Sequence, residues 1–249
     1  VSAFLAATAT KVSVYILLRF IFTVFGIRFS FEILPTAAPF LILAILAMFI
    51  PSIVACFQDN VKRVLAYSSI AQIGYMILGL GFVSVAGLTA SIVHLFNHAL
   101  MKGALFLVLG AIFFRIGSCN LDRMAGLARQ MPWTMAAFVG GGLSLIGIPL
   151  TAGFISKWYL ILAALDKGWW YVAVLIVLSS LIAVIYVWRV IEAAYFREPP
   201  VDLVKVSEAP ISLLVPTWIL VLGNFYFGID TSLSLGMAEM AAKALMGAN

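Results

Sequence analysis

Residues 132–165 read PWTMAAFVGGGLSLIGIPLTAGFISKWYLILAAL, an apolar stretch in which Lys157 is the only charged residue. As one continuous helix it would be about 50 Å long, whereas the hydrocarbon core of a bilayer is about 30 Å thick. Gly147, Pro149 and Gly153 lie in its middle, where proline removes a backbone donor and clashes with the preceding turn. The stretch predicts a membrane-spanning helix broken at its centre, a feature typical of transport sites. A merely kinked or tilted helix is the alternative.

The composition of the whole chain agrees with a membrane location. Of the 249 residues, 64% are hydrophobic and 10% are charged, whereas an average soluble domain has about 25% charged residues. A soluble fold of this size cannot hide so much apolar surface, which excludes a soluble enzyme, a nucleic-acid-binding domain and a disordered chain. The apolar residues form long runs, which favours helices over a β-barrel. The predicted fold class is all-α, a polytopic bundle of transmembrane helices.

Seven stretches are long and apolar enough to be spans. They cover about 2–25, 34–57, 64–84, 88–114, 132–165, 169–195 and 210–228. Residues 231–247 are too few to span and predict a short surface helix. The chain opens on Val1 rather than an initiator methionine, within an apolar run that has no basic n-region. This pattern predicts a fragment that lacks its N-terminal part rather than a chain with a signal peptide.

Basic residues are shared unevenly between the two sides of the predicted spans. The joins after spans two, four and six hold Lys62, Arg63, Arg115, Arg123, Arg129, Arg197 and Lys205. The joins after the other spans hold only Arg28 and Lys167. The first set is therefore predicted to be cytoplasmic, in a bacterial inner membrane, with the C-terminus outside. Glu192, three residues after Arg189, is expected to pair with it on the helix surface.

Three lysines and both histidines of the chain lie inside predicted spans. They are Lys11, His94, His98, Lys102 and Lys157. A central lysine costs about 2.5–3.5 kcal/mol to insert, and a side chain at that depth is too short to reach the membrane surface. These five side chains are therefore expected to face the protein interior, water or one another.

His94, His98 and Lys102 follow one another at four-residue spacing, which places them in one stripe on a helix face. Imidazole changes its charge near pH 6.5, and desolvated amines release protons more easily than amines in water. A row of such groups bridged by water is what proton conduction requires. The alternatives are satisfied core residues, or half of a zinc site. Because no acid or thiol lies near the two histidines in the sequence, no metal is expected.

Three segments carry a resemblance to a known family. They are DNVKRVLAYSSIAQIGYMILGLG (59–81), HLFNHALMKGALFLVLGAI (94–112) and GLSLIGIPLTAGFISKWYLI (142–161). In this order they resemble the proton-conducting antiporter-like family, which comprises the large membrane subunits of respiratory complex I and of Mrp-type cation/proton antiporters. The segments FISKWYL (154–160) and NFYFGIDTSLSLG (224–236) are more similar to the D-type subunit of Mrp antiporters.

The resemblance implies a fold of about fourteen spans with two inverted five-helix repeats, of which this chain is the C-terminal half. Residues 1–33 would be the last helix of the first repeat plus a loop. Residues 34–196 would be the second, proton-conducting repeat with its broken helix at about 132–165, and residues 197–249 a loop, the final span and the surface helix. The ion-paired glutamate and lysine of the first repeat are not present, so the chain alone would hold half a path.

The resemblance also implies roles for the buried charges. Lys11 is similar to the central lysine between the two half-channels. His94, His98 and Lys102 are similar to the residues that link the centre to the second half-channel. Lys157 is similar to the terminal proton-exchanging group.

Proton translocation as a subunit of a multisubunit Na⁺/H⁺ antiporter is the hypothesis that follows. Other membrane subunits, the lipid bilayer, protons and Na⁺ would be its partners. A proton-pumping membrane subunit of a redox complex, an NADH-quinone oxidoreductase or a membrane-bound hydrogenase, is the alternative. A structural scaffold with a decayed path is the third. No covalent chemistry, cofactor or nucleic-acid partner is expected.

Overall fold

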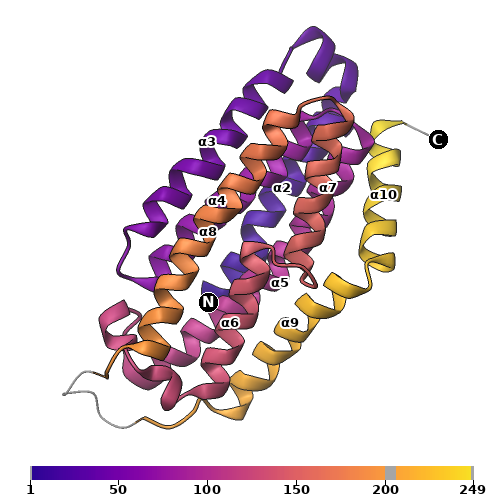
Figure 1. Ribbon diagram of the computed structural model, residues 1–249. Coiled ribbons are helices and arrows are strands. Elements are labelled where there is room, and N and C mark those ends of the chain that lie inside the picture. The colour runs from indigo at the N-terminus through magenta and orange to yellow at the C-terminus, as the bar shows by residue number, and fades with distance from the viewer. Residues whose placement is uncertain (1, 200–205, 248–249) are drawn as a thin grey trace.

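The long helices run side by side along one direction in the computed structural model, which describes residues 2–199 and 206–247 (Figure 1). The α-helices are α1 (Ser2–Phe4), α2 (Thr10–Arg19), α3 (Ala37–Cys56), α4 (Val61–Gly81), α5 (Val85–Ile116), α6 (Pro132–Ile146), α7 (Ala152–Asp166), α8 (Trp170–Phe196), α9 (Ile211–Ile229) and α10 (Ser232–Met246). Other helical turns are η1 (Leu5–Ala9), η2 (Phe20–Phe25), η3 (Arg28–Ile33), η4 (Leu121–Met124) and η5 (Leu127–Arg129). Lys205, counted above, lies outside the described residues.

Six helices of the described chain are long and apolar enough to cross a membrane. They are Ser2–Phe25, Ala37–Cys56, Val61–Gly81, Val85–Ile116, Trp170–Phe196 and Ile211–Ile229. The fifth predicted span, 132–165, consists of α6 and α7, each of 15 residues, which are separated by residues 147–151. The all-α fold class and the discontinuous helix predicted from the sequence are therefore confirmed.

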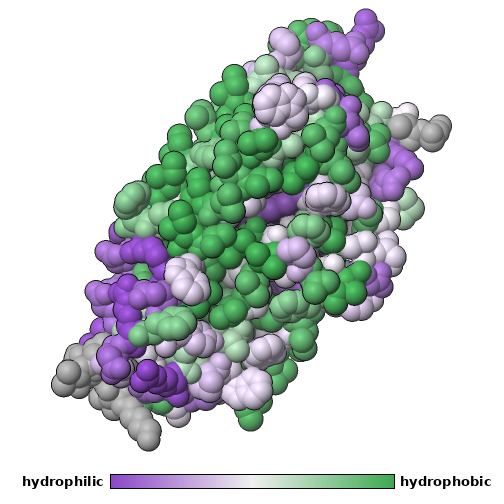
Figure 2. All heavy atoms as spheres, viewed as in Figure 1, coloured by the Kyte–Doolittle hydropathy of each residue, from purple (hydrophilic) through white to green (hydrophobic). Residues whose placement is uncertain are grey.

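Apolar side chains cover most of the middle of the face shown in Figure 2, and hydrophilic residues gather toward the two ends of that face. Ile42 and Leu43 of α3 are 60% and 58% exposed, and Leu181 of α8 is 55% exposed. Such large apolar side chains are suited to lipid chains, which are as apolar as leucine itself. The surface therefore supports an integral, multi-pass membrane protein.

Helix α5 is the centre of the bundle. Ser84 caps its start, where its Oγ accepts a hydrogen bond from the Gly87 N–H at 3.2 Å, and Gly117 follows its last residue with a φ of 67° that turns the chain out of the helix. It packs against α4, α6, α7, α9 and α10. Because neighbours cover it on several sides, the polar stripe on α5 is enclosed by protein along the membrane-spanning part.

The loop between α3 and α4 contacts the C-terminal part of α8 at one end of the bundle. Arg189 of α8 donates to the Cys56 carbonyl and, at 3.1 Å, to Asp59. Glu192 pairs with Arg197 at 2.7 Å, so the expected pair between Glu192 and Arg189 is wrong. Arg189 is drawn to the α3–α4 loop because a carboxylate and the free carbonyls at the end of α3 both lie there. The described C-terminal helix ends at the opposite end of the bundle (Figure 1).

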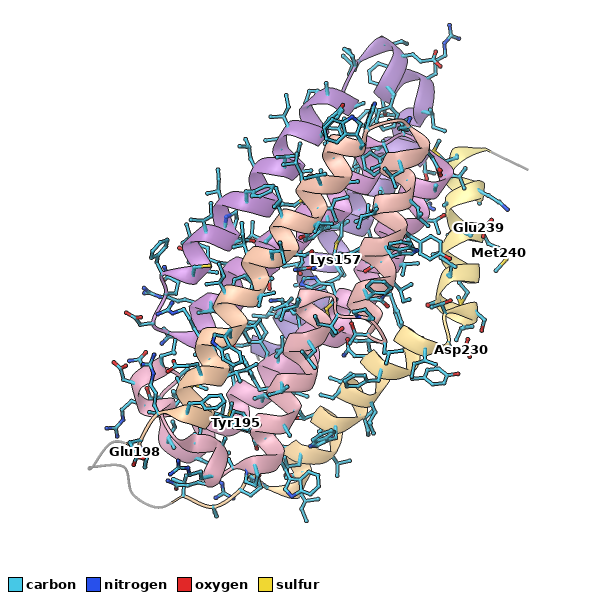
Figure 3. The ribbon with its side chains drawn as sticks, viewed as in Figure 1. Lys157, Tyr195, Glu198, Asp230, Glu239 and Met240 are labelled. Atoms are coloured by element: carbon cyan, nitrogen blue, oxygen red, sulfur yellow. The ribbon has the colours of Figure 1, made fainter. Side chains whose placement is uncertain are left out.

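The segment 231–247 forms the expected short helix, α10. Asp230 precedes it, and its carboxylate accepts from the backbone N–H and the hydroxyl of Ser232 at 3.0 and 2.6 Å. These hydrogen bonds lower the pKa of Asp230. Ala242 is buried, whereas Met240 is 66% exposed and points away from the bundle (Figure 3). The helix therefore lies along the outside of the bundle beside α5.

Glu208, in the segment before α9, holds the first turn of α6. Its carboxylate accepts from the Trp133 N–H at 2.7 Å and from the Thr134 hydroxyl at 2.5 Å. A carboxylate at a helix N-terminus satisfies free N–H groups and complements the helix dipole. We expect Glu208→Ala to lower the free energy of unfolding by about 1 kcal/mol, as loss of a capping group does.

Thermal unfolding of the detergent-solubilised protein measures the effect of Glu208→Ala. Glu198→Ala is the matched control, because Glu198 is exposed at the same end of the bundle (Figure 3). Equal midpoints for the two variants would show that the capping contacts do not stabilise α6.

Candidate proton path through the bundle

The break between α6 and α7 brings two half-helices against each other. Helix α6 ends at Gly147, which has a φ of 91°. Helix α7 starts so close to α6 that a Cβ on Gly153 would overlap the Ser144 carbonyl, and the Gly153 N–H donates to Ser144 Oγ at 3.2 Å. The break was predicted at Gly147, Pro149 and Gly153; Gly147 and Pro149 lie in it, whereas Gly153 lies in the first turn of α7. The last carbonyls of α6 are thereby left without helical partners at the depth of the membrane.

Lys157 of α7 occupies the end of α6. Its amine donates to the carbonyls of Leu145 and Ile146 at 3.1 and 2.8 Å. The negative end of the helix dipole favours a cation at this position. The side chain is 4% exposed and lies about midway between the charged ends of the bundle (Figure 3). The broken helix therefore creates a binding place for a lysine ammonium inside the bundle.

Two buried histidines continue the row from Lys157 along α5. His94 Nδ1 lies 2.7 Å from the hydroxyl of Ser156, the residue next to Lys157. The rings of His94 and His98 are parallel, with centroids 6.0 Å apart. His94 Nε2 and both ring nitrogens of His98 are buried and have no hydrogen-bond partner within the described residues. Buried nitrogens of this kind are typical positions for ordered water.

Lys102 is fully buried and turns from α5 toward α4. Its amine donates to the Leu65 carbonyl at 2.9 Å and to the hydroxyl of Ser68. At this end of the row of His94 and His98 lies the Lys102 amine, which donates hydrogen bonds to a carbonyl and a hydroxyl of α4.

Lys11 comes from the first span and is 5% exposed. Its amine donates to the Ala6 carbonyl in η1, within its own helix. The structure thus brings all five predicted side chains to the interior, but it directs the amines of Lys11 and Lys102 to backbone and hydroxyl oxygens.

Two further polar residues belong to this cluster. Ser156 joins His94 to the segment that carries Lys157, and the ring of Tyr75 lies 4.9 Å from Lys157 Nζ and 5.5 Å from the His94 ring. Ser156 directly precedes Lys157, a predicted site residue, so its position in the sequence could have indicated that it belongs to the site. Tyr75 lies on another helix, and sequence reasoning cannot separate its role from polar packing between helices.

A surface pocket of about 230 Å³ reaches Lys157 from the side of the bundle, between α6, α7 and α8. Its lining is mostly apolar and comprises Ile146, Gly147, Ile148, Phe154, Lys157, Trp158, Ile161, Ile176, Val177, Ser180, Leu181 and Val184. Lys157 therefore borders a pocket that opens on the lateral face of the bundle.

No carboxylate accompanies the buried cations within residues 2–199 and 206–247, where the buried charged side chains are Lys11, Lys102 and Lys157. No group of three or more histidine, cysteine, aspartate or glutamate side chains placed to hold a metal ion occurs in that part of the chain. At the loop end of α5, burial raises the pKa of the Cys119 thiol, which favours its protonated, unreactive form. In the part of the chain that the structure describes, the buried row thus offers proton-accepting nitrogens and no buried carboxylate.

The broken helix and its buried cations define a class: multi-pass membrane proteins with a polar path enclosed in a helix bundle. Residues 1–183 match the model of the NADH:quinone oxidoreductase/Mrp antiporter transmembrane family, and the chain belongs to this family.

Individual relatives come from both branches of the family. The chain is 38% identical to the N-type subunit of the NADH-quinone oxidoreductase of Desulforudis audaxviator, over 92% of this chain and 48% of that protein. It is 33% identical to the D-type subunit of the Na⁺/H⁺ antiporter of Alkalihalophilus pseudofirmus, over 80% of this chain and 39% of that protein. The solved Mrp complex from Dietzia sp. matches 96% of this chain and 53% of its own chain, with 25% identity and a TM-score of 0.87. The chain thus spans about half the length of these relatives or less.

Proposed function

We propose that Lys11, Lys102, His98, His94 and Lys157 carry protons through the second half of an antiporter-like membrane subunit. The observation that carries the proposal is the row of buried amines and imidazoles without a buried carboxylate in the described chain. A permanently charged lysine at this depth would be costly, so each amine is expected to release its proton during the working cycle. Groups that must lose and regain protons inside a membrane are suited to proton transfer.

Repulsion between neighbouring positive charges supplies the direction of transfer. A proton on one amine of the row disfavours a second positive charge on its neighbours, because like charges repel. In a medium of low dielectric constant, such repulsion extends over several ångströms. Protonation at one end of the row therefore promotes release toward Lys157, through Ser156 and ordered water.

We propose that the chain acts within a larger complex and works together with other membrane subunits. Na⁺/H⁺ antiport is one coupling, supported by the relative from a Na⁺/H⁺ antiporter and by the likeness to the Mrp complex. Proton pumping driven by a redox reaction is the second, supported by the relative from an NADH-quinone oxidoreductase. In either case the basic loop end would face the cytoplasm of a bacterial cell and the C-terminus the outside.

Everted membrane vesicles that contain the complete complex, with the full-length subunit, test the path and its coupling. Acidification is followed with a pH-sensitive dye after adding either Na⁺ or a reductant such as NADH. A response to Na⁺ supports the antiporter, and a response to the reductant supports the redox complex. We expect Lys102→Met to reduce either response at least about 100-fold, the usual contribution of a positioned proton-transfer group.

Lys62→Met is the matched control for Lys102→Met. Lys62 is exposed at the start of α4, so this variant should transport protons at the wild-type rate. A Lys102→Met variant as active as the wild type would contradict the proposed path and would favour a structural scaffold.

A further inference from the structure

The ring of Tyr75 lies beside both the His94 ring and the Lys157 amine. It lies on α4 and is 1% exposed. The Lys157 amine is 4.9 Å from the centre of its ring, within the range of a cation–π interaction. The His94 ring lies 5.5 Å away, at an interplanar angle of 55°. Among the described residues, no other aromatic ring contacts both groups in this way.

The position of the Tyr75 ring is fixed by its surroundings. Its hydroxyl lies 3.4 Å from Ser180 Oγ on α8. Next to it in the chain, Gly74 packs so closely on α3 that a Cβ there would come within 2.9 Å of the Ala44 carbonyl. These contacts limit the movement of α4 at this point, where the ring lies beside the Lys157 amine.

The Lys157 amine therefore lies between two sets of electron-rich groups. The carbonyls of Leu145 and Ile146 accept its hydrogen bonds, and the face of Tyr75 contributes the negative part of an aromatic quadrupole. An aromatic face stabilises a cation more strongly when water is excluded. With no buried carboxylate in the described chain, the ring takes over part of the role that an acidic partner would have.

We propose that Tyr75 is a positioning residue whose ring face stabilises the charged form of Lys157 and holds its amine at the end of α6, beside the His94–Ser156 pair. The inference rests on the proposed proton path. Without the ring, the ammonium loses part of its stabilisation, and the amine is free to leave the place from which it exchanges protons.

Two substitutions separate the ring from the hydroxyl. Tyr75→Phe keeps the ring, and Tyr75→Leu removes it while leaving an apolar side chain. In vesicles with the full complex, we expect Tyr75→Phe to keep at least about half of the proton transport rate. Tyr75→Leu is expected to lose about tenfold, within the range of a desolvated cation–π contact. The rates are divided by the amount of assembled complex.

A series of fluorinated phenylalanines at position 75 tests the electrostatic role directly. Fluorine withdraws electron density from the ring face and leaves its shape nearly unchanged. We expect the transport rate to fall stepwise with one, two and three fluorines, which a role in packing alone would not produce. The same series at Phe138, a buried residue of α6 with no cation on its ring among the described residues, is the control and should leave the rate unchanged. The series also decides the question if Tyr75→Leu fails to assemble.

Each outcome bears on one proposal. Tyr75→Phe as slow as Tyr75→Leu, a wild-type rate for Tyr75→Leu, or a flat fluorine series would overturn the role of the ring. Lys157→Met, measured in the same vesicles, tests the path itself. If Lys157→Met is inactive while the Tyr75 variants are normal, only the positioning role is wrong. If Lys157→Met is normal, the proposed path is wrong.

Discussion

Lys157→Met is expected to reduce proton transport at least about 100-fold, which is the usual contribution of a positioned group that accepts and donates protons. Methionine keeps much of the length and apolar character of the side chain, but it cannot bind a proton. The carbonyls of Leu145 and Ile146 would lose their donor, and the row from His94 would end without a proton acceptor. Initial rates of acidification in everted vesicles measure the effect.

Two further variants distinguish proton exchange from a need for charge. Lys157→Arg keeps a positive charge, but a guanidinium does not release its proton in proteins, so this variant is also expected to be inactive. Lys167→Met replaces an exposed lysine beside Trp169 near the end of the same helix and should be fully active. Normal transport by Lys157→Arg would show that the site needs only a fixed charge.

Gly153→Ala is expected to have the largest effect on structure. The added methyl group would overlap the Ser144 carbonyl, and backbone atoms cannot move aside as the end of a flexible side chain can. Overpacking in a core costs about 1–3 kcal/mol, and here α7 must also shift relative to α6. We expect a lower thermal midpoint and less assembled complex. The transport rate per complex should also fall, because a shift of about 1 Å in a reacting group can cost about 100-fold.

Gly110→Ala is the matched control for Gly153→Ala. Gly110 lies inside α5, and a Cβ at this position has no neighbouring atom within 4 Å. Alanine favours a helix interior over glycine by about 1 kcal/mol, so this variant should be at least as stable as the wild type. If Gly153→Ala assembles and transports as well as Gly110→Ala, the close contact between the half-helices is unimportant.

The number of spans and the place of the broken helix could be predicted because both depend on local properties. A run of apolar residues inserts as a helix whatever its neighbours are, since every backbone group must bond within the segment. Gly147 and Pro149 interrupt the helix through their own backbone preferences. The cost of a charge in lipid likewise identified Lys157 and the stripe on α5 as interior groups.

The partners of these groups were not predictable in the same way. Arg189 was expected to pair with a residue of its own helix, yet it bonds to Asp59 in a distant loop. Lys102 bonds to Ser68, and Lys157 contacts Tyr75, in each case across a helix interface. Spacing along one helix cannot tell which neighbouring helix will supply a partner.

The residues alone indicate which side chains must face away from lipid. The free energy of transfer from water to hydrocarbon is a property of each residue type, so it can be read from the sequence. They also indicate where the helix breaks. Only the tertiary structure decides that the carbonyls of Leu145 and Ile146 and the ring of Tyr75 meet at Lys157. These contacts depend on how closely neighbouring helices approach each other, as α7 approaches α6 at Gly153 and Ser144. The distance between two helices results from the packing of many side chains at once.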